Sequence, residues 1–136
     1  MRLTITILTG LMTLFAAQAE IVTALRPAIK EAAAKNGVDP VLMEAIIRFE
    51  SGNATSSAAR RKNNLAGIMG RRGQRRYESK EACVEDLGRI LGKYRAKGRV
   101  TVVQISRVYC ASHAKWANRV SSTMSAIRAG KWGRYE

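Results

Sequence analysis

Apolar residues recur at helical spacing along most of this 136-residue chain, and capping residues mark where the helices begin and end. Asp39-Pro40 places an N-capping carboxylate before a proline at the first helical position. Gly37 and Gly98 are helix stops, because glycine readily adopts the left-handed backbone that ends a helix. The pattern predicts long helices at residues 21–36, 39–50, 79–98 and 114–128.

Two segments between these helices have weaker patterns. Residues 53–78 are rich in Ser, Asn, Gly and Arg around one apolar island, Leu65–Met69, which predicts loop, a short helix and a minimal hairpin. Residues 101–108 are β-branched enough for a strand, yet Thr101 can also cap a short helix there. The predicted fold is a single small helical domain, mainly α or α+β, with a minimal or absent β-lobe.

The first 19 residues have the pattern of a secretory signal peptide. Arg2 precedes an uncharged apolar run, residues 3–15, and Ala17-Gln18-Ala19 predicts cleavage before Glu20. An uncut membrane helix is the alternative, but the run is short for one. Residues 20–136 then form one domain in the periplasm or outside the cell, since no linker or repeat divides them.

A formal net charge of +14 predicts a polyanionic partner. The leader holds one Arg and no acid, so +13 remains after cleavage. Around an exported protein the polyanions are cell-wall polymers, lipopolysaccharide and anionic lipid; the alternative is that the charge serves solubility alone. The densest basic segment lacks the interleaved aromatic residues of a nucleic-acid interface, so we expect no nucleic-acid partner. We also expect the protein to be a monomer. The basic residues of this segment, 60–76, are Arg60, Arg61, Lys62, Arg71, Arg72, Arg75 and Arg76.

Two cysteines, Cys83 and Cys110, are an even number in an exported chain, which favours a disulfide over two separate buried thiols. Their spacing and the single histidine give no metal-ligand pattern, so we expect no metal and no cofactor. We interpret His113 as incidental.

One glutamate of the second helix lies where an apolar residue is expected. Met43, Ile46 and Ile47 form one apolar arc, and Glu50 falls in its middle. Glu44 lies on another face and pairs with Arg48 at i,i+4, which predicts the solvent side. Glu50 is therefore the unusual acid of this helix.

Two effects predict a raised pKa for Glu50. Apolar surroundings disfavour the charged carboxylate, and so does the partial negative charge at the C-terminal end of a helix. A carboxylic acid that stays protonated near neutral pH can protonate the leaving oxygen of a glycosidic bond. The alternative is that Glu50 bends outward or pairs with an arginine.

The residues that follow Glu50 resemble the glucosaminidase family of peptidoglycan hydrolases, which includes flagellar muramidase-type domains and autolysins. Residues 46–56, IIRFESGNATS, and 63–68, NNLAGI, match its helix ending in Glu-Ser and its later Asn-Asn-Leu-x-Gly-Ile. Tyr77-Glu78-Ser79 is similar to its Tyr-x-Ser segment, and Tyr109 with Trp116-Ala117 to its C-terminal aromatic segment. The resemblance implies a lysozyme-like fold and makes Glu50 the general acid.

The same resemblance assigns residues to substrate binding. By position it places Asn64 and Gly67 near the cleft floor and Tyr109 in the glycan groove; Ser51 and Asn63 belong to the same motifs. The alternatives are turn formation for the two asparagines and core packing for Tyr109 and Trp116.

A second carboxylate is harder to identify. Residues 69–76 replace the longer insertion typical of the family, and they contain no acid. Glu78 is the best-placed candidate for a second catalytic acid, and the others are Glu81, Glu85 and Asp86. With no second acid, either the substrate's N-acetyl group acts as nucleophile, or Glu50 alone acts as acid and base in a lytic transglycosylase.

Three functions from different classes remain. The first is a peptidoglycan glycan-cleaving enzyme, favoured by the intact Glu50-Ser51. The second is a catalytically silent wall-binding or secretion-assembly module on the same fold. The third is a cationic protein that acts on membranes through its charge.

Overall fold

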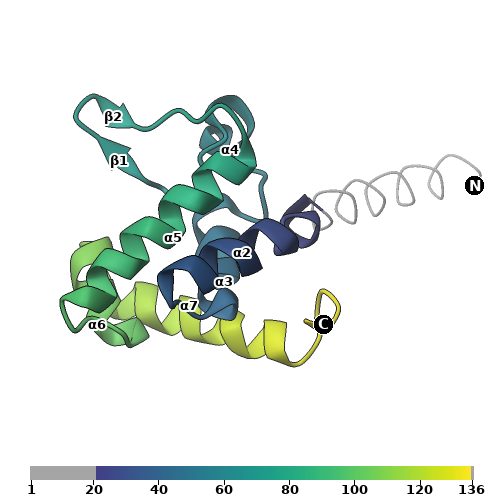
Figure 1. Ribbon diagram of the computed structural model, residues 1–136, viewed down its shortest axis with the longest axis vertical. Coiled ribbons are helices and arrows are strands. Elements are labelled where there is room, and N and C mark those ends of the chain that lie inside the picture. The colour runs from purple at the N-terminus through teal and green to yellow at the C-terminus, as the bar shows by residue number, and fades with distance from the viewer. Residues whose placement is uncertain (1–20, 136) are drawn as a thin grey trace, which may run out of the picture.

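The computed structural model describes residues 21–135; the predicted signal peptide, residues 1–19, lies outside them. Residues 21–24 are helical and precede the first labelled helix. Figure 1 shows α4 and the hairpin at one end of the molecule, α6 and α7 at the other, and α5 running between them. The elements are α2 (Arg26–Asn36), α3 (Pro40–Ser51), α4 (Ser57–Lys62), β1 (Met69–Gly70), β2 (Gly73–Gln74), α5 (Lys80–Ala96), α6 (Val102–Tyr109) and α7 (His113–Arg128).

The predicted caps form the helix ends. The Asp39 carboxylate accepts a hydrogen bond from the Val41 N–H at 2.8 Å, and Pro40 opens α3. Ser79 caps α5 by accepting from the Ala82 N–H at 3.0 Å. The ambiguous segment 101–108 is helix α6, because Thr101 and Gln104 form a reciprocal capping box.

The helices form the body of the domain, and the sheet is vestigial. Helix α2 packs on α3 and α5, while α7 packs on α3 and α6. The two strands pair antiparallel over two positions only, Met69 with Gln74 and Gly70 with Gly73. The prediction of a mainly α domain with a minimal β-lobe is confirmed. No helix within residues 21–135 is long and apolar enough to cross a lipid bilayer.

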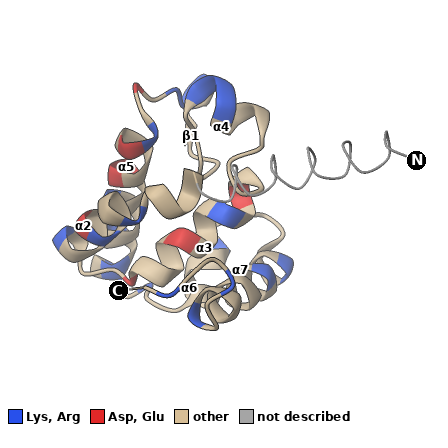
Figure 2. Ribbon diagram, turned by 90° about the vertical axis from the view of Figure 1, so that its right-hand side faces the viewer, with Lys and Arg blue, Asp and Glu red and all other residues tan. Residues whose placement is uncertain are grey.

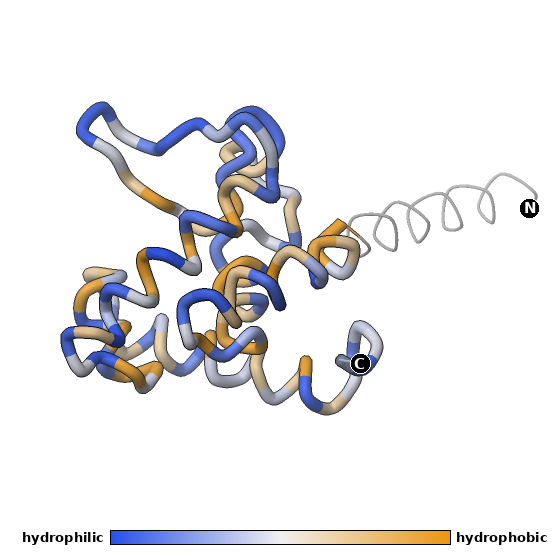
Figure 3. Tube along the Cα trace, in the orientation of Figure 1, coloured by the Kyte–Doolittle hydropathy of each residue, from blue (hydrophilic) through white to orange (hydrophobic). Residues whose placement is uncertain are grey.

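The core lies between α2, α3, α5 and α7. The apolar arc of α3 is fully buried, with Met43, Ile46 and Ile47 all at 0% exposure. Gly88 lets α5 approach α2 closely, because a Cβ there would lie 3.0 Å from the Ala32 Cβ. Figure 3 shows the hairpin and α4 as largely hydrophilic, unlike the helices around the core.

The predicted disulfide is wrong. Cys83 and Cys110 are both free thiols. Cys83 is buried under the loop that follows α4, where its Sγ accepts the Leu65 N–H at 3.3 Å, and Cys110 follows the end of α6. Burial raises the pKa of Cys83 to about 11, so this thiol stays protonated and unreactive near neutral pH.

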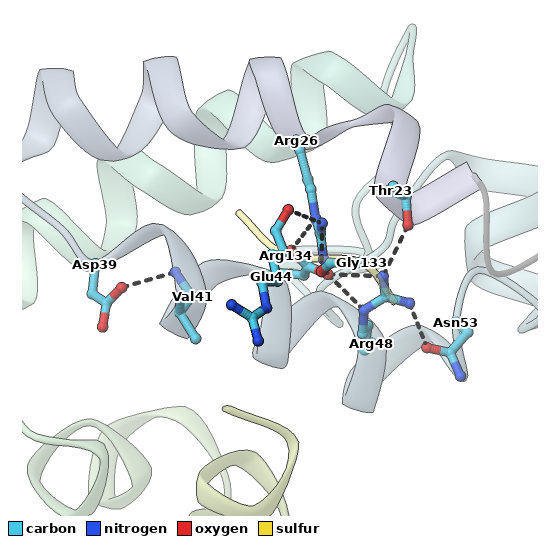
Figure 4. Close-up of polar contacts among 9 residues, drawn as sticks. All are labelled: Thr23, Arg26, Asp39, Val41, Glu44, Arg48, Asn53, Gly133 and Arg134. Atoms are coloured by element: carbon cyan, nitrogen blue, oxygen red, sulfur yellow. Dashed lines mark hydrogen bonds and ion pairs between the residues drawn. The ribbon is translucent and has the colours of Figure 1, made fainter. Parts of the chain in front are cut away.

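The prediction that Glu44 faces solvent is also wrong. Its side chain is completely buried, and every residue from Leu42 to Arg48 is buried with it. Arg26 of α2 donates to both Glu44 oxygens, at 3.0 and 3.1 Å, and Arg48 Nε donates to Oε1 at 2.8 Å (Figure 4). The polar face of α3 is covered by the rest of the protein.

The C-terminal segment, residues 131–135, provides part of that cover. Arg26 Nη1 donates to the backbone oxygens of Gly133 at 3.0 Å and Arg134 at 3.4 Å. The Arg26 guanidinium lies 4.4 Å from the centre of the Tyr135 ring, and that of Arg48 lies 4.0 Å from the centre of a Trp132 ring. Two arginines thus join Glu44 to the end of the chain.

Candidate active site

Glu50 lies in the last turn of α3, half-buried beside the apolar arc. Burial raises the pKa of this carboxyl, and a hydrogen bond from Trp116 partly opposes the rise. Glu50 makes no ion pair with any residue in 21–135, although the chain has 24 basic residues. The protonated form is therefore favoured at higher pH than for an exposed glutamate.

The two oxygens of Glu50 have different neighbours. Trp116, on α7, donates its indole Nε1–H to Oε1 at 2.7 Å. Oε2 lies against Gly67, where a Cβ built on the glycine would be 3.0 Å away. Gly67 also has a φ of 64°, which is unfavourable for other residues. Only glycine both adopts this backbone and leaves the carboxyl its space.

The loop that carries Gly67 is held by Asn64, a predicted substrate-binding residue. Asn64 is 1% exposed, and its amide donates to the backbone oxygens of Ile68 and Arg75, both at 2.9 Å. Its Oδ1 accepts from the N–H groups of Ala66 at 3.4 Å and Ile68 at 3.1 Å. All four hydrogen-bonding positions of this amide are used within the protein, so Asn64 acts by shaping the loop.

Ser51 and Asn63 also bind the backbone. Ser51 is fully buried; its hydroxyl donates to the Ile47 oxygen at 2.5 Å and accepts from the Ala54 N–H at 2.9 Å, which fixes the turn after α3. Asn63 ends α4 with a φ of 52° and donates to the Tyr77 oxygen at 3.2 Å. Both side chains position the segments around Glu50.

Tyr109 lies next to this loop and to Trp116. Its ring centroid is 5.1 Å from that of Trp116, and the rings are tilted by 32°. The phenol donates a hydrogen bond to the Ala66 backbone oxygen. Burial, and after it the charge of Glu50, raises the pKa of Tyr109 far above its usual value. Tyr109 therefore stays a neutral hydrogen-bond donor.

An open groove of about 280 Å³ lies beside these residues. It runs between the base of the hairpin, α5 and the end of α6. Met69, 62% exposed, and Val108, 40% exposed, are the exposed residues of its lining. Apolar and aromatic side chains of this kind suit the flat faces of sugar rings. Its lining residues are Gly67, Ile68, Met69, Ile90, Tyr94, Val108 and Tyr109.

No second carboxylate among residues 21–135 contributes to the pKa shift of Glu50. Glu78 is exposed in the segment between β2 and α5. Asp86 is bound by Arg75 at 3.0 Å and Arg89 at 2.5 Å, and its Oδ2 accepts the Tyr77 hydroxyl at 2.5 Å. Burial would raise the pKa of Asp86, but these partners lower it. Glu81 and Glu85 line a different pocket, between α2 and α5.

The basic segment forms the outer surface of α4 and the hairpin. Figure 2 shows basic residues along α4. Arg75 is paired with Asp86, and Arg76 donates to the Arg61 backbone oxygen at 2.6 Å. Arg60, Arg61, Arg71 and Arg72 are exposed and make no ion pair within residues 21–135. No group of three or more His, Cys, Asp or Glu side chains in the described range is arranged to hold a metal ion.

Sequence reasoning missed the contact of Trp116 with Glu50. The helical spacing of Trp116 with Val120, Met124 and Ile127 predicts core packing, and all four are indeed buried. Trp116 belongs both to the core face of α7 and to the site. Its helical periodicity therefore predicts only core packing and gives no indication of the hydrogen bond to Glu50. The N–H of a buried indole, which needs a partner, is the one available signal.

Comparison with known families gives the class of this protein. The Glucosaminidase family model, described as mannosyl-glycoprotein endo-beta-N-acetylglucosaminidase, matches residues 26–129. A match over most of the chain defines the class as peptidoglycan-degrading glycosidases. The chain belongs to the glucosaminidase family, which confirms the resemblance seen around Glu50. Comparisons with curated proteins and with solved structures found no match.

Proposed function

We propose that this protein is an exported peptidoglycan hydrolase that cleaves β-1,4 glycosidic bonds with Glu50 as general acid. One observation carries the proposal: Glu50 is a half-buried carboxyl with a raised pKa and no ion pair within residues 21–135, and its Oε2 lies against Gly67, which lines an open groove of apolar and aromatic residues. A protonated carboxyl in this position can donate its proton to the leaving oxygen of a glycan bound in the groove.

Cleavage of the glycosidic bond leaves positive charge on the anomeric carbon of the sugar, and a second group determines how that carbon reacts next. In canonical hydrolysis a second carboxylate attacks the anomeric carbon or activates water. We propose Glu78 for this role, since it belongs to the Tyr-x-Ser segment and Asp86 is occupied by two arginines. Glu78 is exposed. It acts only if substrate binding brings the bond within its reach, so its test is separate from that of Glu50.

A second candidate function is lytic transglycosylation. Burial and Trp116 account for the pKa shift of Glu50, and no other carboxylate within residues 21–135 contributes to it, which favours this reaction. In that reaction Glu50 protonates the leaving oxygen and then accepts the proton of the muramic acid C6 hydroxyl. The product is an anhydro sugar, and no other acid is required.

Export and wall binding complete the proposal. The family's substrate lies outside the cytoplasm, and residues 1–19 provide the predicted leader. The exposed arginines of α4 and the hairpin bind peptide-stem carboxylates or other anionic envelope polymers. The mature protein acts as a monomer. Intact-protein mass spectrometry tests the export step. A mass that matches a chain starting at Glu20 supports it, and an uncut N-terminus in secreted material contradicts it.

The decisive experiment is a digest of purified peptidoglycan by the mature protein and by Glu50→Gln, with products identified by mass spectrometry. Reducing ends on N-acetylglucosamine or N-acetylmuramic acid, lost in the variant, support the hydrolase and name the bond. Anhydro-muramic products, lost in the variant, support the transglycosylase. No products from the native protein, or the same products from both proteins, leave a silent wall-binding or secretion-assembly module.

Glu78→Gln separates the two mechanisms further. A loss of hydrolysis in this variant supports Glu78 as the second carboxylate. Undiminished activity excludes that role and leaves a reaction that uses one glutamate. Glu81→Gln, in the first turn of α5 and outside the residues that line the groove, is the matched control.

A further inference from the structure

Trp116 reaches Glu50 from another helix. Trp116 lies on α7, 66 positions along the chain from Glu50, and is 1% exposed. Its Nε1–H donates to Oε1 at 2.7 Å, a short distance for a nitrogen donor. Because the indole nitrogen can only donate, Oε1 must be the accepting oxygen of this carboxyl.

Contacts with Tyr109 fix the position of the indole. Tyr109 stacks on Trp116 and binds the Ala66 oxygen, and Gly67, the next residue, lies against Oε2 of Glu50. These contacts form a closed ring that passes through α3, α7, the end of α6 and the loop after α4. The carboxyl is held on both sides, with one oxygen at the indole and the other at Gly67.

We propose that Trp116 is the positioning residue of this site: its N–H holds Oε1, so that Oε2 carries the proton delivered to the substrate. The inference rests on the proposed function. As the bond between the anomeric carbon and the leaving oxygen breaks, its electron pair stays with that oxygen. The Oε2 proton moves to the same oxygen, and the indole N–H then stabilises the Glu50 carboxylate that remains.

The other titratable groups around Glu50 stay neutral while it titrates. Tyr109, at the end of α6, has a pKa raised far above its usual value by burial and by the Glu50 charge. Cys83, on α5 beneath the loop, has a pKa raised by burial to about 11. Trp116 on α7 and Gly67 on the loop do not titrate. A pH profile of activity therefore reports the Glu50 carboxyl in its high-pH limb.

The first test is Trp116→Phe, which keeps an aromatic ring against Tyr109 and removes the donor. We expect kcat to fall about tenfold or more with a smaller change in KM, as for loss of a group that acts in the transition state. The high-pH limb should move to higher pH, because the hydrogen bond from Trp116 lowers the pKa of Glu50. Trp132→Phe is the matched control, since Trp132 contacts Arg48 and Lys131 instead.

A second variant separates positioning from folding. In the Trp132→Phe background Trp116 is the sole tryptophan, and incorporation of benzothienylalanine replaces its N–H by sulfur with the ring size nearly preserved. This substitution should reproduce the kinetic and pH effects of Trp116→Phe with little loss of thermal stability. Lower thermal stability with unchanged kcat and an unmoved limb would show a packing role and overturn the proposal.

The carboxyl titration of Glu50 by ¹³C NMR needs no substrate. We expect the Glu50 midpoint to rise in Trp116→Phe and to stay in place in Trp132→Phe. An unmoved midpoint in Trp116→Phe would overturn the proposal whatever the activity. A native protein that is inactive on peptidoglycan, yet shows the expected midpoint change, would remove the proposed function and retain the control of Glu50 by Trp116.

Discussion

The two glutamates of α3 lie six residues apart, about 240° around the helix axis, in opposite environments. Glu44 is completely buried between Arg26 and Arg48; burial alone would raise its pKa, but these partners lower it. Glu50 is less exposed to solvent than a surface glutamate and has no charged partner within residues 21–135, so burial raises its pKa, and the hydrogen bond from the neutral Trp116 indole only partly opposes the rise. The partners, and not the degree of burial, decide whether a carboxyl is structural or able to donate a proton.

The sharpest test of this comparison is Glu50→Gln. We expect the rate of glycan cleavage to fall by about 10²- to 10⁴-fold, as for loss of a general acid, because an amide cannot donate the proton. Thermal stability near neutral pH should be retained or slightly higher, since no ion pair is lost and the amide carries no charge to be disfavoured by burial. Soluble fragments released over time and a thermal melt measure both quantities. Retained activity would assign the chemistry to another residue.

Glu44→Gln should give the opposite result. Arg26 and Arg48 would remain buried without their carboxylate, which costs about 3–5 kcal/mol of the free energy of unfolding. Activity per folded molecule should remain. Urea unfolding measures the loss, and Glu31→Gln, in an exposed pair with Lys35, is the control that should leave stability nearly unchanged. A Glu44→Gln protein of native stability would contradict the structural role of this cluster.

Gly67→Ala tests the space around Oε2. A Cβ at a φ of 64° costs about 1–2 kcal/mol of backbone strain, and here it would also displace the Glu50 carboxyl. Gly98→Ala is the matched control, because Gly98 has a φ of 79° with no atom within 4 Å of the added Cβ. Both variants should lose stability, and Gly67→Ala alone should lose activity. Equal activity in the two would contradict the close contact with Glu50.

The smallest expected effect is the pH dependence of stability. Glu44, with a lowered pKa, contributes stability above its unfolded pKa of about 4.3, and that contribution is lost as the pH falls through its folded pKa. Glu50, with a raised pKa, contributes below about pH 4.3 and loses its contribution as the pH rises through its folded pKa.

Unfolding curves across pH separate the two contributions. In Glu44→Gln, the free energy of unfolding should depend less on pH on the acid side. In Glu50→Gln, it should depend less on pH above about pH 4.3. The same profile for all three proteins would contradict the opposite pKa directions.

Local signals predicted most of the fold. Asp39, Ser79 and Thr101 cap helices through contacts within three residues, so their effect is visible in the sequence itself. The burial of Glu44 was mispredicted because its cover comes from Arg26 and residues 131–135, far away in the chain. An i,i+4 pair with Arg48 has the same spacing on a buried face as on an exposed one.

The candidate site was predictable in part. The apolar arc and the flanking motifs singled out Glu50, Gly67 and Tyr109, and the structure brings them together. The contact between Trp116 and Glu50 depends on how α7 packs across α3, and no local sequence pattern specifies that packing. The disulfide prediction used only the number of cysteines, whereas the Cys83 thiol is directed at the Leu65 N–H.

The contact of Arg26 with Gly133 joins positions 107 residues apart and so fastens the two ends of the described domain to each other. Bringing such distant positions together costs conformational entropy, which the contact must offset. Tension applied between residues 26 and 133 would load this contact and the Arg26–Glu44 ion pair directly. These contacts join the two ends of the described domain through Arg26, whose guanidinium also binds Glu44, and none of these residues lines the groove.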